Sequence, residues 1–182
     1  MNIPIKLFRT QDQSVIDGSL ITLSDKHLRD VSVFWEPRLA QSEEEDSHWN
    51  WYQKHQSTEN YPNYEKYSVE CEQITQGLMM IEIDCHRSRC EPGKSIVYID
   101  FLATAPWNRP SLENPPKYRG VGSVLFDFAR QRSHELEYQG RLGLHSLPRA
   151  ESFYLKQGMK NFGSDHDKQK LIYFELEREQ NE

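Results

Sequence analysis

The sequence has no long apolar run, few cysteines and no excess of basic residues. No stretch approaches the roughly 20 apolar residues that a membrane-spanning helix needs, so no membrane partner is expected. The N-terminal segment also lacks the apolar region and cleavage site of a signal peptide. The cysteines number three, at positions 71, 85 and 90. Three cannot all pair with one another, so we expect a reduced, cytoplasmic protein.

Acidic residues outnumber basic ones by 28 to 22, and the formal charge is −6. Nucleic-acid binding relies on a basic excess, so no nucleic-acid partner is expected. A mildly acidic surface is compatible with a cationic substrate, although it is also ordinary for a soluble protein. With 182 residues, the chain is long enough to bury a sizeable core. It predicts a single domain over 1–182.

The N-terminal part of the chain is only partly readable. Residues 1–40 match no clear pattern, and the run VSVFW at 31–35 fits either a strand or the buried face of a helix. Residues 43–56 predict a helix, because an acidic run suits a helix N-terminus. HisTrpAsnTrp at 48–51 then contributes either core aromatics or the wall of a substrate pocket.

From residue 64 onward, strands and helices are easier to recognise. The patterns predict strands over 64–73, 78–85, 94–104, 141–147 and 170–177, and helices over about 120–138 and 149–158. A turn at 75–77 would join the first two strands as an antiparallel hairpin. The order strand, glycine-rich loop, helix, strand then favours a parallel pair. The predicted fold is a mixed α/β (α+β) sheet, mainly antiparallel, flanked by helices.

The stretch KYRGVGSVLFDFAR (117–130) places Gly120 and Gly122 between basic residues and an apolar helical pattern. The first turn of a helix has free N–H groups and a partial positive charge, and glycine lets an anion approach them closely. Lys117 and Arg119 add positive charge. The stretch therefore predicts a phosphate or pyrophosphate cradle. A tight connection that needs a positive φ at Gly120 explains the same glycine equally well.

Two motifs resemble those of the GNAT superfamily of acyl-CoA-dependent N-acyltransferases. KYRGVG at 117–122, after TAP at 104–106, is similar to the family pattern (Gln/Arg)-x-x-G-x-(G/A) after a strand that often ends in V-x-P. AESFYLKQGM at 150–159 is similar to A-x-x-F-Y-x-K-x-G-F. The motifs stand in the order of the family, and the resemblance covers about residues 68–177.

The chain departs from the family pattern at several positions. Lys117 stands where the family has glutamine or arginine, and it keeps the positive charge. Met159 stands where the family has phenylalanine, and it keeps the bulk. Leu147 stands where the family often has an asparagine, which puts one polar contact to the cofactor in doubt. The loop between Pro106 and Gly120 is longer than is usual for the family. It either lines a substrate site or is a surface elaboration.

The resemblance implies a single GNAT-like domain, with residues 68–177 as the acyl-CoA-binding core and residues 1–60 divergent. It implies an N-acetyltransferase that moves an acetyl group from acetyl-CoA to a primary amine by direct attack. The pantetheine arm of the coenzyme would pair with the backbone of Leu102, Ala103 and Thr104, and the Ala103 amide is a candidate oxyanion donor. The pyrophosphate would be held by Lys117 and by the amides of Arg119, Gly120, Val121, Gly122 and Ser123.

The resemblance also assigns a general acid, and the residues themselves suggest candidates for a base. Tyr154 matches the general acid that protonates the departing thiolate, although a tyrosine packed on the cofactor fits as well. Asp100 is the first candidate for the base or the amine anchor because of its place on the strand: it lies two residues before Leu102, on the same face as Leu102 and Thr104. A strand carboxylate paired with a lysine or arginine is the alternative. Glu82 and Asp84 on the preceding strand, and His145, are further candidates for the base. For His145 the alternative is a hydrogen-bonded structural histidine.

Two other functions are compatible with the same motifs. One is a catalytically silent module that binds an acyl-CoA, and the other is a protein-lysine or N-terminal acetyltransferase. Cys85-His86-x-x-x-Cys90 superficially resembles a metal site, but structural zinc takes four ligands, so no metal is expected. The sequence does not identify the acceptor, and it leaves a homodimer open.

Overall fold

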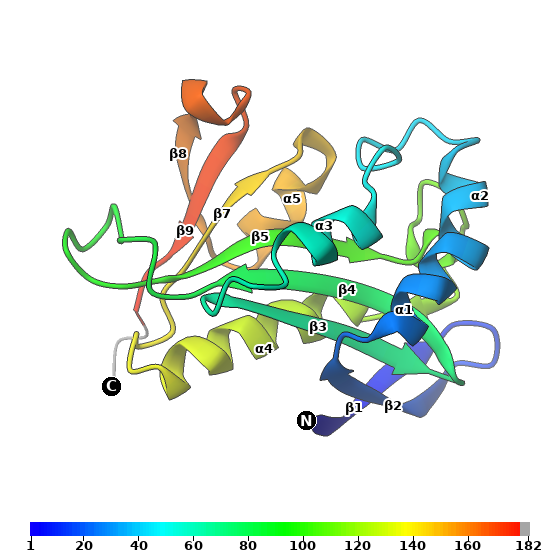
Figure 1. The fold of residues 1–182 in the computed structure, drawn as a ribbon. Helices are drawn as coiled ribbons and strands as arrows, with labels where there is room; N and C mark the ends of the chain where they lie inside the picture. Colours follow the sequence, from blue (N-terminus) through cyan, green and yellow to red (C-terminus); the bar gives the residue numbers. More distant parts are fainter. Residues whose placement is uncertain (179–182) are drawn as a thin grey trace. The chain divides into compact units, whose positions relative to one another are not determined.

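The computed structural model describes residues 1–178, and Figure 1 shows the order of its strands and helices. The strands are β1 (Asn2–Arg9), β2 (Ser14–Thr22), β3 (Tyr64–Cys71), β4 (Ile74–Glu82), β5 (Val97–Thr104), β6 (Tyr118–Arg119), β7 (Leu142–Ser146), β8 (Lys160–Ser164) and β9 (Ile172–Leu176). The α-helices are α1 (Asp25–Asp30), α2 (Glu36–Leu39), α3 (Trp51–Ser57), α4 (Val121–Glu135) and α5 (Glu151–Lys156). A π-helical turn, Val31–Trp35, lies between α1 and α2.

The strands form a nine-stranded sheet in the order β6-β1-β2-β3-β4-β5-β7-β9-β8. The pairing of β5 with β7 is parallel, whereas β1 with β2 and β6, β2 with β3, and β9 with β7 and β8 pair in antiparallel fashion. The predicted mixed α/β fold, mainly antiparallel with one parallel pair, is therefore confirmed. Within residues 1–178, no helix is both long and apolar enough to cross a membrane.

The chain divides into two compact units. The first comprises residues 1–62, 66–80 and 101–126, and the second comprises residues 63–65 and 81–100 together with the chain from residue 127 onward. The predicted single domain over 1–182 stays a prediction, and its last four positions lie outside the described residues.

In the first unit, β1 pairs with β2 over its full length, and the Phe8–Arg119 and Arg9–Tyr118 pairs join it to β6. The sequence did not reveal β1 or β2, because each strand buries only one side chain fully. These are Leu7 in β1 and Leu20 in β2. β1 thereby supports β6, which directly precedes α4.

The turn between β3 and β4 lies at Glu72 and Gln73, both of which have positive φ (50° and 63°). The predicted turn at 75–77 is therefore wrong, since these residues belong to β4. Thr75 and Gln76 read as turn residues because they are polar, yet they are 0% and 1% exposed. Their polar groups are satisfied inside the unit. The Asp30 carboxylate, for example, accepts hydrogen bonds from the Thr75 amide (2.9 Å) and hydroxyl (2.7 Å).

Gly77 also looks like a turn residue in the sequence, but in the structure a close contact between a strand and a helix requires the glycine. A Cβ at this position would lie 2.7 Å from Val121 Cγ1 and 2.9 Å from Leu125 Cδ1. Only glycine allows the first turns of α4 to pack this closely against β4. Gly77 therefore marks a close approach between a strand and a helix.

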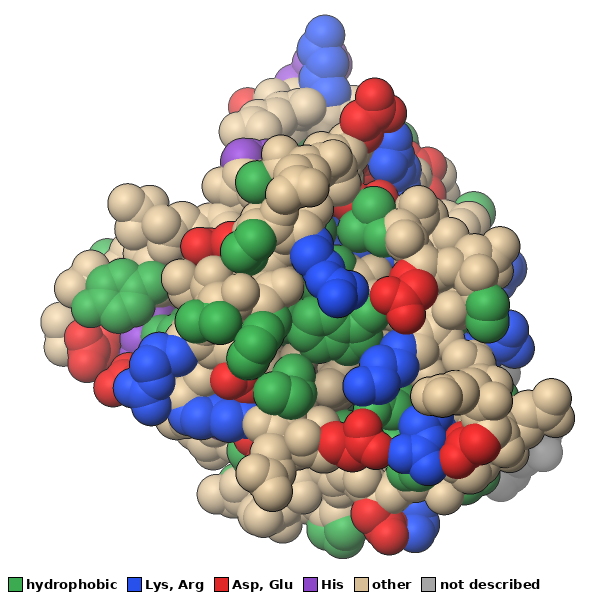
Figure 2. All heavy atoms as spheres, turned by 90° about the vertical axis from the view of Figure 1, so that its right-hand side faces the viewer, with side chains coloured by type: hydrophobic (Ala, Val, Ile, Leu, Met, Phe, Trp, Pro, Cys, Tyr) green, Lys and Arg blue, Asp and Glu red, His purple; other side chains and the backbone are tan. Residues whose placement is uncertain are grey.

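The VSVFW run is helical and continues α1 into α2. Its Val31 and Trp35 are buried, and the Trp35 indole donates to the Thr75 carbonyl (3.2 Å). Val33 and Phe34 from the same turn are 61% and 42% exposed. On the face shown in Figure 2, hydrophobic side chains reach the surface among charged side chains of both signs.

The helix predicted over 43–56 is shorter than expected. α3 begins only at Trp51, where the Asn50 side chain caps it by accepting from the Gln53 amide (2.8 Å). The acidic residues at 43–46 precede the helix by several positions, so their predicted role at a helix N-terminus is wrong. Two of them, Glu44 and Asp46, bind Arg109 instead.

The second unit is built around β7, which pairs with β5 on one side and β9 on the other. Its core includes buried apolar side chains from these strands: Val97, Ile99, Leu142, Leu144 and Phe174. Glu175 of β9 is fully buried. Its carboxylate accepts from the amides of Arg89 (2.8 Å) and Cys90 (3.1 Å) and from the Ser88 and Tyr173 hydroxyls, which fixes the loop before β5.

Candidate functional site

The start of α4 has an exposed backbone and a glycine in an unusual conformation. Gly120 has a φ of +94°, and a Cβ at this position would meet nothing within 4 Å. The Val124 amide donates to the Gly120 carbonyl (2.9 Å) as the first hydrogen bond of the helix. The amides of Val121, Gly122 and Ser123 therefore precede the helical ladder, as the first amides of any helix do. The positive φ at Gly120 is confirmed, and the anion cradle stays a prediction.

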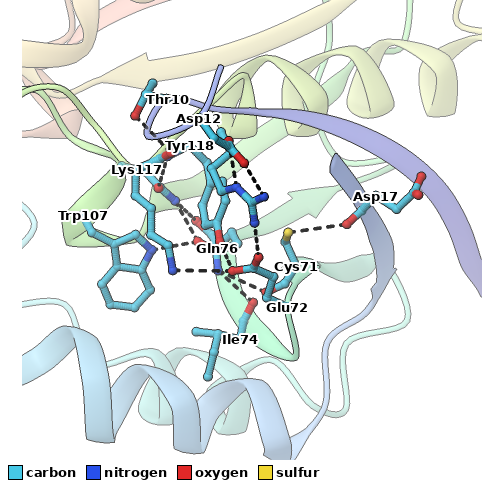
Figure 3. A network of polar contacts seen from close by, with 12 residues as sticks. Thr10, Asp12, Asp17, Cys71, Glu72, Ile74, Gln76, Trp107, Lys117 and Tyr118 are labelled. Carbon is cyan, nitrogen blue, oxygen red and sulfur yellow. Dashed lines mark hydrogen bonds and ion pairs between the residues drawn. The ribbon is translucent and has the colours of Figure 1, made fainter. Parts of the chain in front are cut away.

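The segment before α4 is fastened to its surroundings through Lys117 and Tyr118. The Lys117 amide donates to the Trp107 carbonyl (2.7 Å), and the Lys117 carbonyl accepts from the Thr10 amide (3.1 Å). The Lys117 ammonium lies 3.7 Å from a Glu72 carboxylate oxygen. The Tyr118 hydroxyl donates to the same carboxylate. Glu72 thus balances part of the Lys117 charge that was predicted to attract an anion (Figure 3).

Arg9 of β1 completes this network. Its guanidinium donates to Glu72 (2.5 Å), and it holds both carboxylate oxygens of Asp12 at 3.1 and 2.7 Å. Figure 3 labels Glu72 together with Asp12, Lys117 and Tyr118 of this network. The pKa of Glu72 lies below its ordinary value, chiefly because its carboxylate accepts a hydrogen bond from Tyr118. Burial raises this pKa, but the nearby positive charges of Lys117 and Arg9 lower it further. Glu72 is therefore an ionised anchor for the segment before α4, which the sequence did not indicate.

Arg109 fixes the long loop that follows β5. Its guanidinium binds both oxygens of Asp46, at 2.6 and 2.8 Å, and one oxygen of Glu44 at 3.0 Å. Its Nε donates to the Thr104 carbonyl at the end of β5 (2.9 Å). Burial works to lower the pKa of Arg109, but the hydrogen bonds to Asp46 and Glu44 outweigh it and raise the pKa. The guanidinium therefore stays charged although Arg109 is only 9% exposed.

Gln76 holds the same loop from the side of β4. Its side-chain oxygen accepts from the Trp107 indole (2.8 Å) and from the Asn108 amide group (3.0 Å). The Asn108 side-chain oxygen in turn accepts from the Tyr118 backbone amide (3.0 Å). Both ends of the 107–117 loop are thus anchored (Figure 3). The sequence offered one sign of this anchoring role: Gln76 is a polar residue just before the apolar run that begins at residue 78.

The parallel ladder between β5 and β7 is short. It runs from the Val97–Leu142 pair to the Ile99–Leu144 pair, whereas β5 continues to Thr104. Leu102 and Thr104 are partly exposed, and Ala103 is buried. The backbone predicted to pair with a pantetheine arm therefore lies beyond the last registered pair with β7.

Asp100 lies in β5 and accepts a hydrogen bond from the Tyr64 hydroxyl (3.0 Å). Burial and the charge of Asp100 raise the pKa of Tyr64, so this hydroxyl stays protonated and remains a donor. The sequence had suggested a lysine or arginine as the alternative partner of Asp100. The tyrosine contact was not foreseen, because Tyr64 lies on another strand.

The other candidates for a base also have partners in the second unit. Glu82 contacts the His86 ring (2.7 Å), and Asp84 accepts from the Tyr138 hydroxyl. These contacts tie each carboxylate to a neighbouring side chain.

His145 is bonded through both ring nitrogens. Its Nδ1 lies 2.7 Å from the Tyr98 hydroxyl, and its Nε2 lies 3.1 Å from an Asp165 oxygen. Burial lowers the pKa of His145, although the hydrogen bond to Asp165 opposes this shift. A neutral ring that accepts from Tyr98 and donates to Asp165 satisfies both contacts, which is typical of a structural histidine.

Tyr154 lies in α5 and is 7% exposed. Its ring packs edge-on against Phe153, with the centroids 5.2 Å apart, and lies 6.2 Å from the Phe174 ring. Burial raises the pKa of Tyr154 well above its ordinary value. The phenol is therefore protonated at neutral pH, as a general acid must be, and its catalytic role stays a prediction.

No family model matches the sequence, and a search of curated proteins finds no significant relative. Solved structures do match. The PaiA N-acetyltransferase from Thermoplasma acidophilum, in complex with coenzyme A, is 12% identical, with a TM-score of 0.59 over 89% of this chain and 99% of that chain. An acetyltransferase from Thermus thermophilus is 13% identical, with a TM-score of 0.57 over 87% and 96%. FeeM, an N-acyl amino acid synthase from uncultured soil microbes, is 14% identical, with a TM-score of 0.58 over 88% and 89%. The chain has the GNAT fold.

Within this GNAT fold, the predicted coenzyme-binding residues all belong to the first unit, and the catalytic candidates Asp100 and Tyr154 belong to the second. The sequence missed three anchoring residues, Glu72, Gln76 and Arg109, because their partners are distant in the sequence. Among residues 1–178, no group of three or more His, Cys, Asp or Glu side chains is arranged to hold a metal ion.

Proposed function

We propose that the protein is an N-acetyltransferase that transfers the acetyl group of acetyl-CoA directly to a primary amine. The observation that carries the proposal is the start of α4 in a GNAT fold, where Gly120 adopts a positive φ and leaves three amides before the helical ladder. Two proteins with a similar fold, the PaiA enzyme and the YlbP N-acetyltransferase of Bacillus subtilis, were solved with coenzyme A.

The amides of residues 119–123 fit the pyrophosphate of the coenzyme, because a helix N-terminus favours negative charge. Lys117 and Arg119 add positive charge. Glu72 balances part of the Lys117 charge, so the exposed Arg119 is expected to contribute more to phosphate binding than Lys117.

The pantetheine arm is expected to pair with β5 beyond its ladder with β7. Arg109 already donates to the Thr104 carbonyl. The pairing should therefore depend more on the backbone of Leu102 and Ala103 than on that of Thr104. The Ala103 amide is the candidate donor for the negative charge that develops on the thioester carbonyl oxygen.

The bound thioester supplies an acyl carbon that an uncharged amine can attack, with a thiolate as the leaving group. An alkylamine has a pKa of about 10.4, so most of it is protonated at pH 7 and must lose a proton first. Asp100, held by Tyr64, either accepts this proton through water or anchors the ammonium group. Tyr154, which is protonated at neutral pH, then donates its proton to the departing thiolate sulfur. The tyrosinate regains a proton through water, because the attacking nitrogen releases one as the amide forms.

Two measurements test the proposal together. Calorimetric titration with CoA should show binding, and incubation with acetyl-CoA and a panel of primary amines should release free thiol. CoA binding without thiol release for any amine would point to the silent acyl-CoA-binding module. Release only with peptides that carry a lysine or a free N-terminus would identify a protein acetyltransferase. Absence of CoA binding to the folded protein would refute the proposal.

A further inference from the structure

Three aromatic side chains of the first unit form a cluster at β5. Trp49 and Phe101 meet edge to face with centroids 5.0 Å apart, and Trp51 lies 5.9 Å from Trp49 and 6.3 Å from Phe101. Trp51 opens α3 and is 3% exposed, whereas Trp49 and Phe101 are partly exposed. Trp51 thus forms the buried base of the cluster, and the other two rings reach its surface.

A positive charge already lies on this cluster. The Lys54 ammonium of α3 is 3.4 Å from the centroid of the Phe101 ring and 5.0 Å from that of the Trp49 ring. The faces of aromatic rings carry partial negative charge, so they attract an ammonium group at such distances. The cluster is therefore shaped to accept an alkylammonium, and the end of the lysine side chain is one.

Phe101 also has a defined place along the strand. It directly precedes Leu102 and Ala103, whose backbone is expected to pair with the pantetheine arm. Successive residues of a strand are about 3.3 Å apart. The Phe101 backbone therefore lies one or two such steps from the proposed position of the thioester. Because side chains alternate along a strand, the Phe101 ring shares a face of β5 with Ala103 and not with Asp100, so an ammonium held by this cluster is not anchored by Asp100.

We propose that Phe101 and Trp49 form a binding surface for the ammonium group of the acceptor, and that the Lys54 ammonium competes with the acceptor for it. This inference rests on the proposed acetyltransferase function and names its acceptor class: a primary alkylamine that is protonated in solution. Arylamines, which are neutral at pH 7, should be poorer acceptors, because a neutral amine gains no cation–π attraction.

Direct binding can be measured without acetyl-CoA. The indole N–H signals of isotope-labelled protein would be followed by NMR during titration with n-butylammonium or with 1-butanol, a neutral molecule of the same shape. The signals of Trp49 and Trp51 should respond to the cation at concentrations where the alcohol has little effect. Trp35 and Trp107 are buried in the same unit, and their signals report whether each variant is folded.

Phe101→Leu keeps an apolar side chain and removes the ring. We expect it to weaken n-butylammonium binding by about 2- to 30-fold, the range between exposed and desolvated cation–π contacts. Phe162→Leu is the control, because Phe162 is an exposed phenylalanine (39%) of the second unit. An equal response to 1-butanol, or unchanged binding in folded Phe101→Leu, would overturn the proposal.

Lys54→Met provides a test of opposite sign. Methionine keeps much of the side-chain length but removes the competing charge, so n-butylammonium should bind about 2- to 30-fold more tightly. Mere damage to the cluster would weaken binding. Lys160→Met removes an exposed lysine of the second unit and should change nothing. Weaker or unchanged binding in folded Lys54→Met would overturn the competition.

Turnover then separates this inference from the proposed function. For any amine that the acetyltransferase accepts, Lys54→Met should lower the KM for the amine and leave the KM for acetyl-CoA unchanged. If the enzyme acetylates amines while n-butylammonium fails to bind the cluster, the cation surface is refuted and the acetyltransferase stands. If the cation binds but CoA does not, the proposed acetyltransferase function fails instead.

Discussion

Replacing Arg109 by methionine should destabilise the protein by about 3–5 kcal/mol, the cost of removing one partner of a buried ion pair. Arg109 and Asp46 are 9% and 8% exposed and are joined by two parallel hydrogen bonds. The change leaves the Asp46 carboxylate in place without its main counter-charge. The Thr104 carbonyl also loses a donor. An exposed pair would contribute only about 0–1 kcal/mol, so burial decides the size of the effect.

The free energy of unfolding would be measured by urea denaturation, followed by far-ultraviolet circular dichroism. The double variant Asp46→Asn with Arg109→Met should recover part of the loss, because it removes the unbalanced negative charge as well. Lys6→Met is the matched control. It breaks an ion pair with Asp17 in which both side chains are largely exposed, so it should have little effect.

A loss below about 1 kcal/mol for Arg109→Met would equal that of an exposed pair and would refute the reasoning. It would mean that the guanidinium does not fix the 107–117 loop. A double variant no more stable than Arg109→Met would refute the narrower claim that the uncompensated carboxylate causes the loss.

Three further changes test the proposed acetyltransferase function directly. Gly122→Val should weaken CoA binding in calorimetry while the fold persists, because the branched side chain stands where the pyrophosphate must approach. The control Gln131→Val, further along α4, should leave CoA binding unchanged. Equal CoA affinities of Gly122→Val and the unmodified protein would refute the pyrophosphate cradle. Asp100→Asn should lower turnover more at neutral than at high pH if Asp100 is the base, since free amine is abundant at high pH; a loss independent of pH would indicate an anchor or a structural role. Tyr154→Phe should lower kcat by about 10²- to 10⁴-fold, towards the lower end because a thiolate is a good leaving group, with CoA affinity nearly unchanged. A variant that keeps its kcat, with chemistry limiting the rate, would leave Tyr154 as a packing residue.

The sequence by itself determined much of the chain from residue 94 onward. The apolar run of β5 and the apolar stripe of α4 are local patterns, and both elements lie near their predicted positions. The glycines at the start of α4 likewise marked where this helix begins. The parallel pairing of β5 with β7 followed from the order of elements. These features are legible because each depends on residues only a few positions apart.

The N-terminal strands and the β3–β4 turn were not legible for the opposite reason. β1 and β2 each bury one side chain fully, so neither shows a strong apolar pattern. Thr75 and Gln76 look like turn residues until their buried partners are known. Gly77 looks like one until the approach of α4 is seen. Burial, which the sequence does not state, decided these elements.

The candidate site divides in the same way. The glycines, Lys117 and Tyr154 stand in short motifs, so the sequence alone could nominate them. Arg109 binds Asp46 across 63 positions, and Tyr118 binds Glu72 across 46. Lys54 reaches Phe101 across a similar stretch of chain. Only the tertiary structure brings such residues within a few ångströms, because the free energy of each contact depends on distance and burial and not on separation along the chain.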